Sequence, residues 1–289
     1  MKTRKNKKLN GEIVKHLKDK IVLITGGAGS IGSELTKKIL EYQVRSVRVL
    51  DINEHSLFNL GRALNDSRLR LLLGSILDKD RIEMAGENVD VIFHAAAIKN
   101  IEISEYNPIE TIETNIIGTV NLIKMVQNKK PSIFLNISTD KAVDSSTIYG
   151  SSKKVGEKLV NWAGNHILTT KFGTARFGNV IQTKGNVFEV WENEMKQNKS
   201  LSITHLEMKR YLFDIEDAVK FILDCLPITN KGEIFVPKMK LYKIQDLAKK
   251  ISKKHKVIGL RKGEKLEEIL MTDEEQKKAI ETKTMWIIK

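Results

Sequence analysis

From Lys20 onward, short apolar runs alternate with longer stretches of helical periodicity. Runs such as "KIVLITG" and "VDVIFHAAA" are nearly continuous in apolar residues, as expected of strands buried on both sides of a sheet, and "VRSVRVLD" is rich in β-branched residues. The intervening stretches, among them "SIGSELTKKILEYQ" and "TIETNIIGTVNLIKMVQ", place apolar residues at helical spacing. The alternation predicts a doubly wound α/β fold, in which helices cover both faces of a parallel sheet.

The alternation becomes irregular after Gly178, where helical and strand-like segments follow one another without a repeating order. We therefore expect a basic N-terminal segment over residues 1–18 and a doubly wound domain over residues 19–178. A smaller mixed lobe that binds substrate is expected mainly from residues 179–289, with individual segments free to return to the first domain.

The chain has 289 residues, of which 41% are hydrophobic, and this is enough to bury a substantial core. Its single cysteine, Cys225, cannot form an intramolecular disulfide, which favours a reducing compartment. We see no signal-peptide pattern and no apolar run close to the roughly 20 residues of a membrane span. A cytoplasmic protein is therefore expected.

The formal net charge is +13, and part of this excess lies in the basic N-terminal stretch "MKTRKNKKLN". Nucleic-acid binding needs clustered basic residues and, for single strands, interleaved aromatic side chains. Aromatic residues are only 6% of this chain and do not interleave with the basic runs, so we expect no nucleic-acid partner. Peripheral contact of the N-terminus with an anionic membrane stays open as an alternative.

A glycine-rich turn, "LITGGAGSIGSEL", joins the first expected strand to the first helix. Glycines there allow a tight turn and close approach of the backbone to a pyrophosphate, while the helix N-terminus favours negative charge. The turn therefore predicts a dinucleotide-binding Rossmann domain. The cofactor contacts expected at this turn are Gly26, Gly29, Ser30, Ile31 and Gly32.

Two further features extend the expected cofactor site. Asp51 ends the second strand, 19 residues after Gly32, where a carboxylate can accept hydrogen bonds from both ribose hydroxyls and would repel a 2′-phosphate. This favours NAD over NADP. Ala95 and Ala96 follow His94 at the end of the fourth strand and leave room for a flat cofactor, whereas His94 itself is expected to be a packed, non-catalytic histidine.

Tyr149 and Lys153 are spaced Y-x-x-x-K on an expected helix, which places them on one helical face. A lysine ammonium near a phenol favours the phenolate, so we expect Lys153 to lower the pKa of Tyr149. Tyr149 could then accept a proton from a sugar hydroxyl while hydride leaves for the nicotinamide.

The motifs "TGGAGSIG", "HAAAIK", "NISTDKA" and "YGSSK" together resemble the extended short-chain dehydrogenases/reductases. More narrowly, "STDKAVDSSTIYGSSK", "RFGNV", "GEIFVPKM" and "GLRKGEKLEE" resemble the nucleotide-sugar 4,6-dehydratases of polysaccharide biosynthesis, which act on UDP-N-acetylglucosamine. The similarity extends from about Gly11 to about Met271. It implies oxidation at C4, elimination of water across C5 and C6, and return of hydride to C6.

The resemblance also implies roles for individual residues. Thr139 would hydrogen-bond the C4 oxygen, Asp140 would be the acid and Lys141 the base of the elimination, and Tyr149 with Lys153 would serve the redox step, Lys153 also contacting NAD. For the substrate it implies Lys99 near the sugar, Asn179 at the diphosphate, and Arg261 with Glu264 at the pyrophosphate and the edge of the site. We expect no metal, and we expect a homo-oligomer.

Other outcomes stay open at the level of sequence. A UDP-sugar epimerase acting at C4 or C2 would use the same keto intermediate, although typical 4-epimerases lack an Asp-Lys pair after the threonine. A non-catalytic NAD-binding regulator is a third reading. Tyr149 is typical of soluble relatives that invert C5, whereas Asp51 and "GGAGSIGSEL" resemble the membrane-linked group, so retention or inversion at C5 is open.

Overall fold

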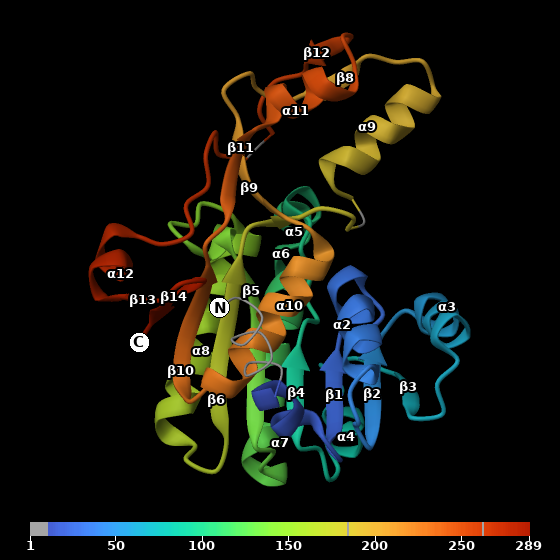
Figure 1. Cartoon of the computed structure of the whole chain (residues 1–289), viewed down its shortest axis with the longest axis vertical. Coiled ribbons are helices and arrows are strands. Elements are labelled where there is room, and N and C mark those ends of the chain that lie inside the picture. The colour runs from blue at the N-terminus through green and yellow to red at the C-terminus, as the bar shows by residue number, and fades with distance from the viewer. Residues whose placement is uncertain (1–10, 184, 262) are drawn as a thin grey trace.

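The computed structural model describes residues 11–183, 185–261 and 263–289. Within these residues one large sheet runs through the lower part of the molecule in Figure 1. Its strands are β1 (Ile21–Thr25), β2 (Ser46–Asp51), β3 (Leu69–Leu73), β4 (Val91–His94), β5 (Ile133–Thr139), β6 (Lys171–Phe177), β10 (Lys231–Pro237), β13 (Ile280–Glu281) and β14 (Met285–Ile288).

The strand order is β13-β14-β10-β6-β5-β4-β1-β2-β3. All pairings from β3 to β10 are parallel, while β14 is antiparallel to both β10 and β13. The order β3-β2-β1-β4-β5-β6 is that of the Rossmann fold, and it reverses between β1 and β4. Ligands of such sheets bind outside the carboxyl ends of the strands at this reversal. The predicted doubly wound fold is confirmed.

Helices cover both faces of the large sheet. One layer holds α2 (Ser30–Leu40), α3 (Glu54–Leu64) and α10 (Ile215–Cys225), and the other holds α4 (Lys79–Ala85), α7 (Gly118–Lys129) and α8 (Ile148–His166). Neighbouring strand residues face opposite layers, as Leu23 and Ile24 do, and both are fully buried. Burial on both faces explains why these strands are apolar without interruption.

The helical residues 11–17 pack against the same core as α2, since Ile13 and Leu17 are buried there. The basic residues before position 11, on which membrane contact was predicted, lie outside the described residues. Along the part of the chain that the structure describes, no helix has the length and apolar character that a membrane span requires. Cys225 is buried in α10 as a free thiol.

A smaller lobe lies above the carboxyl ends of the strands (Figure 1). It contains β7 (Asn179–Val180), α9 (Val187–Lys196), β8 (Leu201–Ile203), β9 (Lys209–Phe213), β11 (Lys240–Lys243), α11 (Ile244–Ile251) and β12 (His255–Val257). Two small sheets, β11-β9-β7 and β12-β8, and a core around the fully buried Trp191 hold it together. From the same third of the sequence, α10, β10, β13 and β14 belong to the large sheet and its layers.

Candidate active site

A cleft of about 640 Å³ lies where the carboxyl ends of the large sheet meet the smaller lobe. This volume is within the range of small-molecule sites. Ten of its lining residues bear on the argument: Ala95, Lys99, Ser138, Thr139, Lys141, Tyr149, Lys153, Asn179, Arg261 and Glu264. The cleft therefore brings together four of the five expected catalytic residues, Thr139, Lys141, Tyr149 and Lys153, and all four expected substrate residues.

The glycine turn between β1 and α2 is as tight as the sequence predicts. Gly26 has φ +65°, and a Cβ there would lie 2.6 Å from Cα of Ala96, while a Cβ on Gly32 would overlap the carbonyl oxygen of Gly26. α2 begins at Ser30 without a side-chain cap and without an acidic residue in its first turn. Its N-terminus therefore keeps a positive potential suited to a pyrophosphate.

Asp51 reaches this turn from the end of β2. Its Oδ2 accepts a hydrogen bond from the backbone N–H of Ala28 at 3.0 Å, and its Oδ1 accepts one from that of Asn53 at 3.0 Å. These two hydrogen bonds hold the carboxylate in place. Because each carboxylate oxygen has a second lone pair, it can still accept a hydrogen bond from a ribose hydroxyl. These features fit the adenosine end of a dinucleotide.

His94 is buried at the end of β4. Its Nδ1 hydrogen-bonds with Oγ1 of Thr25 at 2.8 Å, and its Nε2 with Oγ1 of Thr119 at 3.0 Å. Burial, with a smaller effect of the charge of Lys153, lowers the pKa of His94 to about 3. The imidazole is thus neutral and structural, as expected.

Tyr149 and Lys153 lie on α8 and are both buried. Burial lowers the pKa of Lys153 to about 8, and the carboxylate of Glu157, one helical turn further on, opposes this shift. For Tyr149 the sequence-based expectation is wrong: burial raises its pKa, a hydrogen bond with the Thr139 side chain lowers it, and the charge of Asp140 raises it. Desolvation of the phenolate outweighs the influence that was expected from Lys153.

The segment after β5 forms a short 3₁₀ turn, η2 (Asp140–Ala142). Oγ1 of Thr139 donates to Oδ1 of Asp140 at 2.9 Å, and Nζ of Lys141 donates to the same oxygen at 3.0 Å. Nζ of Lys141 also donates to Oδ1 of Asn179 at 3.0 Å. Hydrogen bonds therefore connect the side chains of Thr139, Asp140 and Lys141, and Lys141 extends the connection to Asn179.

Asp140 differs from its neighbours in exposure. Its side chain is 0% exposed and does not line the cleft, whereas Thr139 and Lys141 do. Among the described residues, its Oδ2 has no hydrogen-bond partner. Groups in the cleft can therefore reach this carboxylate only through its neighbours.

The four expected substrate residues occupy different parts of the cleft. Lys99 is exposed as a residue, but partial desolvation of its ammonium lowers its pKa, with the charge of Glu189 opposing the shift. The backbone N–H of Arg261 donates to Oε2 of Glu264 at 3.2 Å, while the Arg261 side chain is half exposed and pairs at 3.4 Å with Glu102. Asn179 is held by Lys141.

Sequence reasoning missed Arg210 and Glu268. The side chain of Arg210 is 9% exposed, lines the cleft and contacts Oε1 of Glu264 at 3.5 Å. Glu268 is 4% exposed, and burial raises its pKa while the charge of Lys141 lowers it. Both residues stand in charged stretches of the sequence, where nothing marks one residue as buried.

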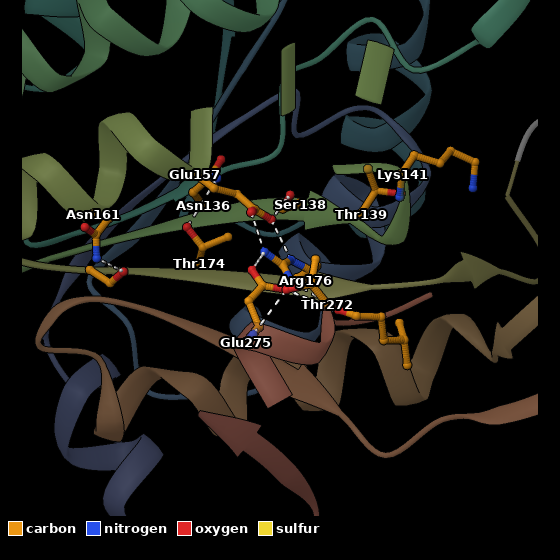
Figure 2. A network of polar contacts seen from close by, with 12 residues as sticks. Asn136, Ser138, Thr139, Lys141, Glu157, Asn161, Thr174, Arg176, Thr272 and Glu275 are labelled. Carbon is orange, nitrogen blue, oxygen red and sulfur yellow. Dashed lines mark hydrogen bonds and ion pairs between the residues drawn. The ribbon is translucent and has the colours of Figure 1, made fainter. Parts of the chain in front are cut away.

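A buried charge network lies directly behind the cleft. Ser138 Oγ donates to Oε1 of Glu157 at 2.6 Å, and Arg176 donates to Oε1 and Oε2 of Glu157 at 2.9 and 2.6 Å. Figure 2 shows Arg176 between Glu157 and Glu275, to which it donates two further bonds of 2.8 and 2.9 Å. The sequence does carry a signal for this network, because an arginine within a strand buried on both faces requires a partner.

Comparison with known proteins places the chain in a family. The sequence model described as polysaccharide biosynthesis protein matches residues 22–289. The chain belongs to the polysaccharide biosynthesis protein family. The resemblance seen in the motifs is thereby confirmed at the level of the family.

Proteins similar to this chain in sequence or structure carry more specific names. The inverting UDP-N-acetylglucosamine 4,6-dehydratase of Campylobacter jejuni is 38% identical over 89% of this chain and 78% of its own. The UDP-glucose 4-epimerase of Rickettsia bellii is 34% identical over 90% of this chain and 80% of its own. The X-ray structure of Pen from Bacillus thuringiensis is 35% identical, covers 94% of this chain and 90% of its own, and has a TM-score of 0.90.

Proposed function

We propose that this protein is an NAD-dependent UDP-sugar 4,6-dehydratase that acts on UDP-N-acetylglucosamine or a close relative of it for surface glycan biosynthesis. The observation that carries the proposal is the arrangement of Thr139, Asp140 and Lys141 beside Tyr149 and Lys153 at one cleft. Similarity to the Campylobacter jejuni dehydratase supports the same reading. The Rickettsia bellii epimerase makes a UDP-sugar epimerase the second candidate.

The cofactor contacts proposed from the sequence fit the geometry of the turn. The backbone at Gly26, Gly29 and Gly32 and the start of α2 would hold the pyrophosphate, and Asp51 would accept the ribose hydroxyls, which favours NAD over NADP. When bound, the nicotinamide would supply reversible hydride transfer at C4 and C6 of the sugar. Lys153 would support the cofactor and Tyr149 from α8.

The residues of the cleft divide the remaining chemistry among them. Thr139 hydrogen-bonds the C4 oxygen, and Tyr149 takes up the proton of the C4 hydroxyl as that carbon becomes a ketone. The ketone acidifies the proton on C5, which Lys141 removes in its neutral form. Asp140 supplies the proton with which the C6 oxygen leaves as water. Lys141 then returns a proton to C5.

The substrate would be held by cations and amides around this center. Arginine suits a diphosphate because its planar fork donates two parallel hydrogen bonds. We propose Arg261 for this contact, with Glu264 orienting Arg261 and Asn179 placed between the diphosphate and Lys141. Lys99, which follows β4 and lines the cleft, would contact the sugar.

Two remaining proposals concern the setting of the enzyme. A homo-oligomer is proposed because exposed apolar side chains gather around α5 (Ile101–Tyr106) and α6 (Pro108–Ile112), where Tyr106 is 87% and Ile109 67% exposed. A cytoplasmic location and peripheral membrane contact through the basic N-terminus stay predictions from the sequence.

One experiment tests the reaction directly. Purified protein is incubated with UDP-N-acetylglucosamine in deuterated water, and the product is followed by NMR. A 4-keto-6-deoxy sugar that carries deuterium at C5 is expected, and its configuration at C5 distinguishes retention from inversion. A product that keeps its C6 oxygen but is inverted at C4 or C2 would identify an epimerase, and an unchanged sugar would refute the proposal for this substrate.

A further inference from the structure

A second cavity, of about 340 Å³, lies at the edge of the large sheet that is remote from β3. Its walls come from α8, α12 (Asp273–Lys278) and the strands β6, β10 and β14, which lie toward the left of Figure 1. The residues described as lining it are all different from those that line the cleft. Its volume is near the lower end of the range for small-molecule sites, which suits a ligand of sugar size rather than a dinucleotide.

The wall of this cavity carries lysines without a partner. Lys154 and Lys158 lie one turn apart on α8, and Lys278 lies in the last turn of α12. Within the part of the chain that the structure describes, none of the three forms an ion pair or a side-chain hydrogen bond. Like charges four residues apart on a helix repel each other, and an anion bound beside them would remove this repulsion.

The carboxylates of the same wall are mostly neutralised already. Arg176 lies between Glu157 and Glu275 (Figure 2), at ion-pair distances of 2.6 and 2.8 Å. Asp144 is paired at 3.1 Å with a lysine outside the wall. Glu274 is the one carboxylate described on this wall that stands against the three unpaired lysines. The cavity therefore has an excess of positive charge.

Apolar side chains complete the wall. Val143, Ile234 and Ile288 line the cavity together with the lysines. Small-molecule sites commonly combine apolar surface with a few charged groups that fix the orientation of the ligand. The cavity thus fits a small organic molecule that carries an anionic group.

Two parts of the wall also belong to the surroundings of the active site. Ala142 lines the cavity and directly follows Lys141 in η2. Glu157 lines the cavity from α8 and accepts a hydrogen bond of 2.6 Å from Ser138, which lines the cleft. A ligand in the cavity would therefore contact segments that position side chains in the cleft.

We propose that this cavity is a regulatory site for an organic anion of sugar size, carrying a phosphate or a carboxylate, and that its occupancy changes the affinity of the cleft for NAD. Binding of the anion is independent of the proposed reaction, whereas the coupling rests on the proposed binding of NAD. By linkage, NAD must change the affinity for the anion by the same factor.

Isoleucine methyl groups can report on the two sites separately by NMR. Ile234 and Ile288 line the cavity, whereas Ile31 and Ile181 line the cleft. Glucose 6-phosphate, glucuronate and uncharged glucose are each titrated into protein with ¹³C-labelled isoleucine methyl groups, in the presence of saturating NAD and UDP.

We expect saturable shifts of the two cavity signals with at least one of the anions and none with glucose. The anion that binds identifies phosphate or carboxylate as the group recognised. Shifts confined to the cleft signals, no saturable shift with either anion, or the same shift with glucose would overturn the proposed site.

A pair of substitutions tests the role of the lysines. Lys154→Gln combined with Lys158→Gln removes two exposed cations and should leave the fold intact. We expect it to weaken binding of the anion about tenfold, the lower end of what a hydrogen bond to a charged group contributes. The matched control, Lys253→Gln with Lys254→Gln, removes two exposed lysines of the smaller lobe and should bind the anion with unchanged affinity. An equal loss in both pairs would refute a specific site.

Calorimetry tests the coupling without relying on turnover. The affinity for NAD is measured with and without a saturating concentration of the anion that binds, and we expect a change of about fivefold or more. The Lys154→Gln and Lys158→Gln pair should lose this change at the same anion concentration. An unchanged affinity for NAD while the anion is bound would refute regulation. Binding of NAD alone is measured first, and its absence would overturn the proposed function instead.

Discussion

Arg176→Met tests whether the buried network behind the cleft holds the fold together. The Arg176 guanidinium makes five hydrogen bonds: two to Glu157, two to Glu275, and one to the carbonyl oxygen of Leu270 at 3.1 Å. Methionine fills similar space without a charge. The change therefore leaves a carboxylate, Glu157, that is only 3% exposed and has lost its cation.

The expected loss follows from these contacts. Two hydrogen bonds between Arg176 and Glu157 contribute about 1.5–3 kcal/mol each, since both partners are charged. Removing one partner of a buried ion pair costs about 3–5 kcal/mol in comparable cases, and we expect a loss in this range. Native domains are stable by only about 5–15 kcal/mol, so the variant should be close to unfolding at room temperature.

Urea denaturation followed by circular dichroism measures the free energy of unfolding, provided that the slope with denaturant is unchanged. The matched control is Lys209→Met, because Lys209 pairs with Glu267 on the surface at 2.9 Å with both side chains more than 40% exposed. An exposed pair contributes about 0–1 kcal/mol. A loss of less than about 1 kcal/mol for Arg176→Met, equal to that of the control, would refute the reasoning.

The pH dependence supplies a second check on the same variant. Burial raises the pKa of Glu275, but the hydrogen bonds and the charge of Arg176 together lower it by more, so that its pKa lies below the usual 4.5. A carboxylate with a lowered pKa in the folded state stabilises the fold above its unfolded pKa, and this contribution is lost as the pH falls through the folded value. The difference between unaltered protein and Arg176→Met should therefore shrink below about pH 4.5.

Three further outcomes are expected. Lys141→Ala should abolish elimination while NAD still binds with unchanged affinity in calorimetry; loss of NAD binding would mean a structural role. Asp51→Ala should weaken NAD binding about tenfold, or about 1.4 kcal/mol, with a smaller effect on NADP; an equal loss for both would argue against a ribose contact. Burial lowers the pKa of Lys153 to about 8 in the folded protein, from 10.5 in the unfolded chain, so between these two pH values the unfolded chain binds more protons than the folded one. The free energy of unfolding should therefore rise between about pH 8 and pH 10.5. Denaturant titrations of Lys153→Met should show no such rise.

The large sheet could be predicted because its signals are local. β5 reads as an unbroken apolar run, and all seven of its residues are buried in the structure. The glycine turn was predictable for the same reason, since the positive φ of Gly26 and the close approach of Gly32 constrain residue types at fixed positions in the sequence. Patterns within about twenty residues were sufficient for both.

Contacts between distant segments could not be predicted in this way. Arg210 and Glu264 are 54 positions apart, and Arg176 and Glu275 are 99 apart, so no spacing rule connects them. Solvation was equally hidden: the expected decrease in the pKa of Tyr149 assumed a nearby ammonium, whereas the phenol is buried and its pKa is raised. The exposure of a side chain is a property of the assembled layers, and motif spacing carries no information about it.

The network around Glu157 combines contacts between residues close in the sequence with contacts between distant segments. Glu157 lies one helical turn after Lys153, and it accepts the hydrogen of Ser138, the residue before Thr139. One carboxylate thus supports the end of β5 and opposes the decrease in the pKa of Lys153. Arg176 joins Glu157 to Glu275 in α12 (Asp273–Lys278), a short helix that lies outside the cleft. We therefore expect a substitution at Glu275 to alter the pKa of Lys153 and the position of Thr139.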